Sequence, residues 1–413
     1  MPARITCFLV LATLFVTSCA VKEKSDVVSD AKLHLRAKEL ADSLIILDGH
    51  IDLPDLLKEK KYKAGIDSPD TLISTGKGEF DFTRAKQGGL DAPFMSIYIP
   101  IEYQSKPDNG KELADSLINT VVAITKALPD QFALANTPAD VEANTAAGKI
   151  SLPMGMENGA PIGNDLKNLK YFYDRGIRYI TLAHNKDNQI CDASRDTSHT
   201  HNGLSPYGKQ VVSEMNRLGI MVDISHVDDS TFYQVMELSK APAIASHSSC
   251  RRFSPTMMRD LTDDMIRKLG EKDGVILINF FTMFLDSTAV RYSSELGALL
   301  KEKNLKETDS LAKPVIEEFK KTHPNPTNIE TVANHIDNVV NIAGIDHVGF
   351  GSDYDGVSGS LPVGLEDVSK YPDLIYTLLK RGYSEEDIAK ICYKNAFRVW
   401  NKVIEVSEQL QGE

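Results

Sequence analysis

The stretch Leu47-Asp48-Gly49-His50-Ile51-Asp52-Leu53-Pro54 decides how the rest of the chain is interpreted. Hydrophobic residues 44–47 lead into it, which is typical of a buried strand. Because side chains alternate along a strand, His50 and Asp52 point to the same side. An imidazole beside a carboxylate suits a divalent metal such as Zn²⁺. A His-x-Asp pair also occurs by chance, so a metal site is predicted only if other strand ends supply further ligands.

Short β-like runs alternate with helical segments along most of the chain. This alternation favours a parallel sheet, and a count of eight runs predicts a closed (β/α)₈ TIM-type barrel. An open doubly wound sheet is the alternative. The runs are residues 44–51, 92–99, 152–156, 179–183, 220–225, 243–246, 275–280 and 348–352.

Amphipathic segments of helical period separate most of these runs. Asp229, Asp260 and Thr262 are expected to cap helix starts. Residues 283–327 depart from the alternation and carry two charged helical segments, which we interpret as an excursion after the seventh strand. The tail, 368–408, is expected to be helical and to pack on the outside of the barrel. The expected helices are 111–128, 138–147, 166–176, 206–218, 230–239 and 262–270.

The N-terminus has the features of an export signal. Arg4 precedes an apolar core, residues 7–16, which is too short to span a bilayer. Val16-Thr17-Ser18-Cys19 resembles the lipobox of bacterial lipoproteins, which implies cleavage before Cys19 and a lipid on its thiol. We therefore expect an exported bacterial lipoprotein, membrane-anchored in the periplasm or at the cell surface. An ordinary secretory signal with an incidental cysteine is the alternative.

The expected organisation is a signal peptide over 1–18, a polar tether over 19–43 with helix only near its end, and a single barrel over 44–410. A composition of 42% hydrophobic and 25% charged residues provides enough apolar material for a core. The formal net charge of −12 argues against a nucleic-acid partner, which requires a basic face. After processing, Cys191, Cys250 and Cys392 keep free thiols, so at most one internal disulfide can form.

Histidines and carboxylates follow six of the expected strands at the point where each strand ends. In a barrel, catalytic residues gather at the carboxyl ends of the strands. Taken singly, each residue has an ordinary structural explanation, such as a core histidine or a carboxylate that caps a loop. The strand ends carry His50 and Asp52, Glu157, His184, His226, His247 and Asp353.

Taken together, three histidines and two carboxylates of this set predict a two-metal site. They exceed the three protein ligands usual for one catalytic zinc, but they fit two metals that share one carboxylate. Two zinc ions, two carboxylates and a bridging hydroxide leave a charge of +1, which stabilises an oxyanion. Asp223 is expected to hold a neighbouring chain or a ligand histidine from behind, and Asp355 to shape the loop after Asp353.

The remaining histidines are expected to have no part in this site. His347 lies too far before Asp353 along the eighth run and is assigned a structural role. The others fall in the tether, in loops or in helices, where they are expected to be solvated or capping. They are His34, His199, His201, His323 and His335.

The motifs around the strand ends resemble those of the membrane (renal-type) dipeptidases, zinc enzymes of the amidohydrolase-like barrel group. The resemblance runs from about Ile46 to Trp400. Its motifs are Asp48-Gly49-His50-Ile51-Asp52, Gln87-Gly88-Gly89-Leu90, Gly155-Met156-Glu157-Asn158-Gly159, Thr181-Leu182-Ala183-His184-Asn185, Asp223-Ile224-Ser225-His226, Ser246-His247-Ser248-Ser249, Arg259-Asp260-Leu261-Thr262-Asp263, Gly351-Ser352-Asp353-Tyr354-Asp355-Gly356 and Gly364-Leu365-Glu366-Asp367-Val368.

The resemblance implies two zinc ions per subunit. His50, Asp52 and Glu157 would hold one ion, and His226 and His247 would hold the other together with Glu157, which would bridge the pair. The function implied is hydrolysis of a dipeptide by a metal-bridging hydroxide.

The resemblance also implies substrate-binding and catalytic residues. His184 would bind the substrate carbonyl and its oxyanion, and Arg259 would hold the terminal carboxylate, which suits a planar guanidinium. Asp353 would meet the free ammonium and assist proton transfer. With one side chain binding each end of the substrate, the site would accept only peptides of two residues.

Three positions depart from the family pattern. Ile51 replaces a polar residue between the two ligands, Asp55 stands where mammalian members have an aromatic residue, and Asn279-Phe280-Phe281 has phenylalanine where they have tyrosine, so one pocket hydroxyl is missing. These departures leave the substrate preference open. The alternatives are another binuclear barrel hydrolase, acting on lactones, phosphoesters or cyclic amides, or a non-catalytic lipoprotein that binds peptides or metal. The sequence also leaves open whether the chain forms a homodimer.

Overall fold

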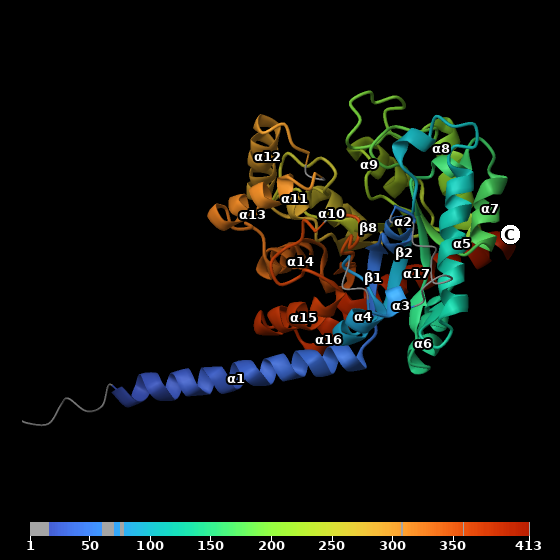
Figure 1. The fold of residues 1–413 in the computed structure, drawn as a ribbon. Coiled ribbons are helices and arrows are strands. Elements are labelled where there is room, and N and C mark those ends of the chain that lie inside the picture. The colour runs from blue at the N-terminus through green and yellow to red at the C-terminus, as the bar shows by residue number, and fades with distance from the viewer. Residues whose placement is uncertain (1–15, 60–69, 75–77, 307–308, 358, 413) are drawn as a thin grey trace, which may run out of the picture.

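The computed structural model describes residues 16–59, 70–74, 78–306, 309–357 and 359–412. Its central feature is a closed barrel of parallel strands, arranged in the order β1-β10-β9-β8-β7-β6-β5-β2 (Figure 1). The predicted (β/α)₈ barrel is confirmed, and the open doubly wound sheet is wrong. The barrel strands are β1 (Ile46–Ile51), β2 (Leu90–Tyr98), β5 (Met154–Glu157), β6 (Ile177–Thr181), β7 (Met221–Asp223), β8 (Ile244–Ser248), β9 (Val275–Ile278) and β10 (Val348–Phe350).

A small parallel sheet outside the barrel was not expected. It pairs β3 (Phe132–Leu134) with β4 (Ile150–Leu152). The expected strand 152–156 is therefore two strands, separated by Pro153, which has no N–H to contribute to a sheet. The carbonyl oxygen of Pro153 accepts the N–H of Met95 at 2.8 Å. The chain thus passes from the small sheet into the barrel across a single proline.

Most helices lie where the sequence predicts them, but two of the three predicted caps are wrong. Thr262 caps α10 as expected. α9 is capped by Asp228, the carboxylate directly before Asp229. Asp260 is not a cap but is buried, and burial raises the pKa of its carboxyl to about 8. The helices of this part are α2 (Leu53–Glu59), α3 (Asp70–Ile73), α4 (Phe82–Gly88), α5 (Lys111–Ala127), α6 (Pro138–Ala146), α7 (Lys167–Asp174), α8 (Pro206–Leu218), α9 (Asp229–Leu238), α10 (Asp263–Glu271) and α14 (Ile329–Ala343).

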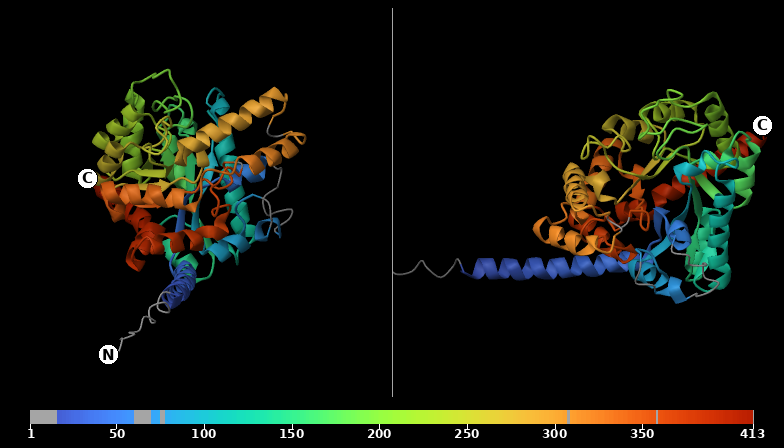
Figure 2. Two further views of the ribbon diagram at one scale, coloured as in Figure 1. Left: turned by 90° about the vertical axis from the view of Figure 1, so that its left-hand side faces the viewer. Right: turned by 45° about the horizontal axis from the view of Figure 1, so that its top comes forward.

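The excursion after β9 consists of α11 (Thr282–Leu285), α12 (Ser287–Glu302) and α13 (Ala312–Thr322). Figures 1 and 2 show α12 and α13 projecting beside the barrel. The two helices share a small apolar cluster of their own, which includes Leu300 and Phe319. The excursion thus forms a satellite of the barrel, and α14 then leads back to β10.

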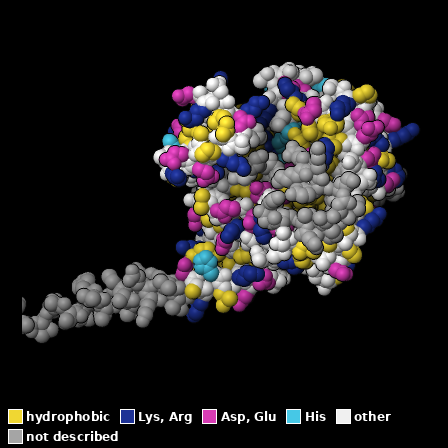
Figure 3. All heavy atoms as spheres, viewed as in Figure 1, with side chains coloured by type: hydrophobic (Ala, Val, Ile, Leu, Met, Phe, Trp, Pro, Cys, Tyr) yellow, Lys and Arg dark blue, Asp and Glu magenta, His cyan; other side chains and the backbone are white. Residues whose placement is uncertain are grey.

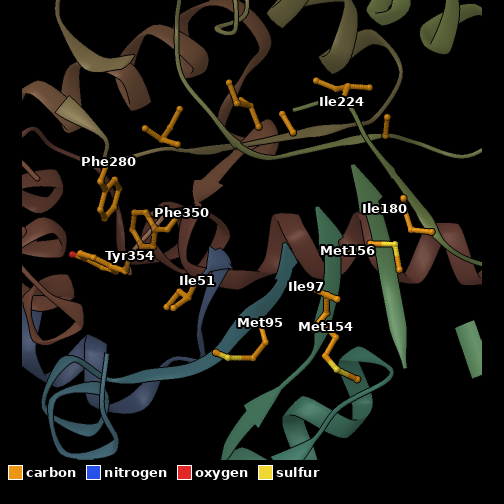
Figure 4. Packing of buried hydrophobic residues seen from close by; sticks show 14 of the residues in the cluster. Ile51, Met95, Ile97, Met154, Met156, Ile180, Ile224, Phe280, Phe350 and Tyr354 are labelled. Atoms are coloured by element: carbon orange, nitrogen blue, oxygen red, sulfur yellow. The ribbon is translucent and has the colours of Figure 1, made fainter. Parts of the chain in front are cut away.

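Side chains of the barrel strands alternate between the interior and the surrounding helices. On β5, Met154 and Met156 belong to the main core between strands and helices, next to Met95 of β2 (Figure 4). Gly155 and Glu157 alternate with them and therefore face the interior. This alternation places the Glu157 carboxylate inside the barrel at its carboxyl end.

The amino-terminal end of the barrel is closed by the last helix, α17 (Asn395–Gly412). Its Trp400 and Phe397 pack on interior side chains that the strands contribute near their starts, such as Leu47 and Val275. The ring of Trp400 lies 5.1 Å from the ring of Phe94, centroid to centroid. The residues of α17 that include Phe397 and Trp400 therefore form a plug at the amino-terminal end of the barrel. The preceding helices, α15 (Tyr371–Lys380) and α16 (Glu385–Ala389), lie outside, as expected.

A long helix, α1 (Val16–Ser43), precedes the barrel and projects from it (Figure 2). The segment expected as a polar tether is therefore helical throughout. Its last turns bury Ala37, Leu40 and Ala41 in the main core. The helix packs against α15, and its Arg36 pairs with Glu385 of α16, so the packed body begins before residue 44. Residues 1–15, which hold most of the predicted signal peptide, lie outside the described residues. Among the described helices, none is both long and apolar enough to cross a membrane.

Candidate metal centre

The predicted side chains of the strand ends converge at the carboxyl end of the barrel. Six of them are buried, and Asp353 is partly exposed. His226 and Asp353 have left-handed backbone conformations, with φ of 68° and 66°, which turn the chain sharply after β7 and β10. The structure thus brings together His50, Asp52, Glu157, His184, His226, His247 and Asp353.

Glu157 lies at the centre of this group, and its two oxygens face different histidines. Oε2 lies 3.5 Å from Nε2 of His50. Oε1 lies 3.0 Å from Nε2 of His226, 3.4 Å from Nε2 of His247 and 3.6 Å from Nε2 of His184. One carboxylate therefore separates two sets of nitrogen donors, as a shared ligand would.

His50 is oriented by a tyrosine inside the barrel. The hydroxyl of Tyr179 lies 2.8 Å from Nδ1 of His50 and 3.1 Å from the carbonyl oxygen of Gly49. Because the hydroxyl proton is donated to that carbonyl, the hydroxyl oxygen accepts the Nδ1–H of His50. The Nε2 lone pair of His50 is then directed into the centre. Gly155 makes room for this tyrosine, since a Cβ there would meet its ring at 1.9 Å.

His247 is oriented through a serine and a buried carboxylate. Oγ of Ser246 donates to Oδ2 of Asp223 at 2.6 Å, so it accepts the Nδ1–H of His247 at 2.7 Å. Asp223 also accepts the Oγ–H of Thr181 and the backbone N–H groups of Ser225 and Ser246. The expectation that Asp223 supports a ligand histidine from behind agrees with this arrangement, which also directs Nε2 of His247 into the centre.

Several nitrogen and oxygen atoms at the centre direct lone pairs into the same space, an arrangement that a bound cation would stabilise. Nε2 of His247 lies 2.9 Å from Nε2 of His226, which accepts a hydrogen bond from Arg259 at 3.1 Å, so two lone pairs face the same space. Nε2 of His50 and Oδ1 of Asp52 are buried without a hydrogen-bond partner among the described residues, which is rare for buried polar atoms. The residues present therefore fit bound divalent metal.

Burial and neighbouring charges set the protonation states here. Burial lowers the pKa of His226 and His247 well below the usual value, which leaves both imidazoles neutral, the form that binds metals. Burial lowers the pKa of His50, but Tyr179 and the nearby carboxylates raise it well above its usual value. The groups around His50 thus favour a positive charge at its imidazole, which either a proton or a metal ion can supply.

Arg259 is a buried cation without a carboxylate partner within ion-pair distance in the described part of the chain. Nη1 donates to Oγ of Ser248 at 2.9 Å, and the guanidinium carbon lies 4.7 Å from the ring centre of Phe284. Nε has no partner among the described residues. Arg259 lies behind the cavity wall, in contact with His226 and Phe284, which both form that wall. An unpaired buried guanidinium beside the cavity suits an anionic group.

The cavity above these residues has a volume of about 360 Å³. Figure 3 shows it as a hollow with a histidine at its floor and basic side chains near its edge. His50 and His247 are fully buried and are not part of the cavity wall. Of the two phenylalanines in Asn279-Phe280-Phe281, Phe281 forms part of the cavity wall, whereas Phe280 packs against Tyr354 in the core (Figure 4). The wall consists of Asp52, Asp55, Leu56, Tyr98, Glu157, His184, Asn185, Arg195, His226, Phe281, Phe284, Asp353, Asp355, Gly356 and Val357.

Three contributors with polar side chains were not singled out from the sequence. Tyr179 lies in an ordinary β-like run and Tyr98 ends another, so neither carries a signal of its own. Arg195 lies in the long loop between β6 and α8, where no periodicity indicates a direction. Asp355 was expected to shape its loop, and it does. It exchanges hydrogen bonds with Glu79 through both backbone N–H groups, at 2.6 and 2.7 Å.

Comparison with known sequences places the chain in one family. Residues 34–413 match the family described as membrane dipeptidase, peptidase family M19. A Schizosaccharomyces pombe protein described as an uncharacterized dipeptidase is 33% identical over 369 residues, which make up 86% of this chain and 80% of that protein. The match begins at His34, within the segment expected as a tether, which agrees with the packing of α1 on the barrel.

Solved structures share the whole architecture. The probable dipeptidase PvdM from Pseudomonas aeruginosa is 27% identical with a TM-score of 0.77, and the match covers 91% of this chain and 99% of that one. A metallo peptidase from Rhodobacter sphaeroides, liganded with a phosphinate mimic of L-Ala-D-Ala, is 26% identical with a TM-score of 0.71 and coverage of 88% and 100%. Since the match extends over barrel and tail alike, this chain belongs to the membrane dipeptidase family and is a metallopeptidase.

Proposed function

We propose that this enzyme hydrolyses dipeptides with the help of two zinc ions that share Glu157. The observation that carries the proposal is the position of this carboxylate, with Oε2 towards His50 and Oε1 towards His226 and His247. A carboxylate between two metals about 3.5–4 Å apart can offer one oxygen to each. Membership of a dipeptidase family supports the reaction, and the mixture of imidazoles and carboxylates supports zinc.

His50, Asp52 and Glu157 would hold one ion, and His226 and His247 would hold the other with Glu157. When bound, the ions supply Lewis-acid chemistry, which lowers the pKa of water and polarises the scissile carbonyl. The binding of the substrate and the movement of protons are left to the other side chains of the cavity.

His184 would bind the carbonyl oxygen of the scissile bond. Its imidazole forms part of the cavity wall and stands edge-on against Tyr98, with ring centres 5.0 Å apart. Burial lowers the pKa of His184, so the ring is neutral and donates one N–H. A fixed donor at this position stabilises the negative charge that develops on the oxygen during attack.

Asp353 would bind the substrate ammonium and carry a proton. Nδ2 of Asn279 donates to its Oδ2 at 2.8 Å and fixes the carboxylate, and its backbone N–H donates to the carbonyl oxygen of His50 at 3.0 Å. Burial, followed by the charge of Asp52, raises the pKa of Asp353 to about 7. A carboxyl with this pKa can accept a proton and return it to the leaving amine.

Arg259 would bind the terminal carboxylate. Its Nη2 donates to Nε2 of His226, and that nitrogen is no longer an acceptor when it serves as a metal ligand. The guanidinium can then offer two parallel N–H groups to a carboxylate. Arg259 and Asp353 would thereby fix the two ends of a dipeptide.

The test is to assay the metal-free and the zinc-loaded enzyme on small dipeptides, with a lactone, a phosphoester and a cyclic amide as rival substrates. We expect turnover of dipeptides alone, and only with metal. Equal rates with and without metal would contradict the mechanism. Faster turnover of a rival substrate would contradict the substrate class.

We also propose that the chain is exported and anchored through a lipid on Cys19. The support is the lipobox-like Val16-Thr17-Ser18-Cys19 after a short apolar core. Incorporation of a labelled fatty acid into the wild type, and its loss in Cys19→Ala, is the expected result. Incorporation that persists in Cys19→Ala would contradict the anchor.

A further inference from the structure

The loop between β6 and α8 holds one arginine at the cavity in a fixed position. The N–H of Ser194 donates to the carbonyl oxygen of His226 at 2.8 Å, and the N–H of Asp196 donates to the carbonyl oxygen of Ala193 at 3.1 Å. Asp187 accepts the N–H of Ala193 at 2.8 Å. The backbone on both sides of Arg195 is thus tied down, on one side to a predicted metal ligand.

Arg195 has no carboxylate partner within ion-pair distance among the residues that the structure describes. Its side chain is exposed and forms part of the cavity wall. The hydrogen bond that it makes is to Sδ of Met257 at 3.9 Å, a weak acceptor. By contrast, Arg251 of the neighbouring segment binds both oxygens of Asp229. Arg195 therefore presents an uncompensated positive charge to the cavity.

Arg195 lies on the Arg259 side of the cavity. Met257, which it contacts, is two residues before Arg259 in the chain. Both arginines act on the same buried carboxyl, since their charges lower the pKa of Asp260 against the larger effect of burial. The carboxylates of Asp52 and Asp353 group instead with His50, on the other side of Glu157. The cavity is thus polarised, with positive charge where the substrate's C-terminal residue would lie.

We propose that Arg195 binds the side-chain carboxylate of the substrate's C-terminal residue, so that the enzyme prefers dipeptides that end in aspartate or glutamate. This inference rests on the proposed function, which assigns the terminal carboxylate to Arg259. With that carboxylate held, the side chain of the same residue projects into the space beside it. Arg195 supplies the charge and the planar donor pair that a second carboxylate requires.

The test compares matched substrates that differ in one charge. The ratio of kcat/KM for Ala-Asp to that for Ala-Asn, and for Ala-Glu to Ala-Gln, isolates the side-chain carboxylate from the terminal one. Each substrate is offered with an L and with a D residue at its C-terminus. The variants are Arg195→Gln and Arg195→Glu. Arg252→Gln is the control, because Arg252 is exposed, pairs with Asp263 and is not part of the cavity wall.

We expect the wild type to favour the acidic member of each pair by roughly tenfold, as for a charge-assisted contact at a partly solvated site. Arg195→Gln should bring the ratio close to one, and Arg195→Glu should invert it, while Arg252→Gln keeps the wild-type ratio. A ratio unchanged in Arg195→Gln overturns the proposal. An equal loss for both members also overturns it, since Arg195 would then bind the terminal carboxylate. If the zinc-loaded wild type hydrolyses no dipeptide, the proposed function itself fails. That result differs from an unchanged ratio and from an equal loss, which concern Arg195 alone.

Discussion

The two ends of the barrel are built from the same strands but from opposite kinds of side chain. At the carboxyl end, buried imidazoles and carboxylates surround Glu157, and several of their polar atoms lack partners among the described residues. At the amino end, apolar side chains such as Leu47 and Phe94 pack against Trp400. Burying polar groups costs stability, whereas packing an aromatic ring contributes to it. The plug therefore stabilises a fold whose other end carries the polar groups for chemistry.

Tyr179 connects the two ends. Its ring packs with Phe94 in the apolar cluster that Trp400 also joins, with ring centres 5.2 Å apart. Its hydroxyl reaches up to Nδ1 of His50. A single side chain therefore belongs to the plug through its ring and to the metal centre through its oxygen. Substitutions at the two ends and at Tyr179 test whether stability depends mainly on the amino end and activity mainly on the carboxyl end.

The largest effect is expected from Glu157→Gln at the carboxyl end. Glutamine keeps the shape but replaces one donor oxygen with an NH₂ group that cannot bind metal. We expect kcat/KM to fall at least about a thousandfold, because a two-metal centre contributes several kcal/mol to the transition state. The metal content should fall below two ions per chain. The control Glu330→Gln, on the exposed surface, should remain near wild type. Two bound ions and full activity in Glu157→Gln would contradict the proposal that two metal ions share Glu157.

The next effect is expected from Trp400→Ala at the amino end. Removing this fully buried ring from the plug should lower the free energy of unfolding by about 3–5 kcal/mol. Urea denaturation of the zinc-loaded enzyme measures the loss. The value of kcat, measured at a temperature where the variant is folded, should stay close to wild type. A loss of kcat that matches the loss in Glu157→Gln would mean that the two ends are not separable.

The smallest effect is expected from Tyr179→Phe at the junction. The ring and its packing remain, but His50 loses the acceptor for its Nδ1–H. We expect zinc affinity and kcat/KM to fall about 10- to 100-fold, as when the support of a metal ligand is removed. The free energy of unfolding should change by only about 1 kcal/mol. Tyr207→Phe is the control, because the Tyr207 hydroxyl has no hydrogen-bond partner among the described residues. Indistinguishable behaviour of the two variants would show that Tyr179 does not orient His50.

Much of the barrel could be predicted because its signals are local. The barrel strands are short apolar runs, and the site residues directly follow them. The alternation of strands and helices, together with the residues at the strand ends, was therefore enough to predict that Glu157, His226 and His247 lie close together. The roles of these residues as metal ligands stay predictions. Thr262 was predicted correctly as a cap, but the sequence offered Asp260 two residues earlier as another, and only the burial of Asp260 in the fold excludes it. Asp229 was wrong by one position, since an equally good carboxylate, Asp228, precedes it.

The features that could not be predicted depend on tertiary packing. The sequence predicts a solvated or capping His335, but this histidine is buried in α14. It accepts the N–H of Cys250 at 3.0 Å and donates to the carbonyl oxygen of Leu285 at 2.9 Å. Both partners lie far from it in the chain. The same holds for Trp400, whose place in the plug depends on side chains from several strands. No periodicity in the sequence carries such information.

Anomalous diffraction at the zinc absorption edge, from crystals of the zinc-loaded enzyme, would locate the metal ions directly. The account predicts two anomalous peaks about 3.5–4 Å apart, one bound by each oxygen of Glu157, with His50 at one peak and His226 and His247 at the other. A single peak, or two peaks that leave either oxygen of Glu157 unbound, would contradict it.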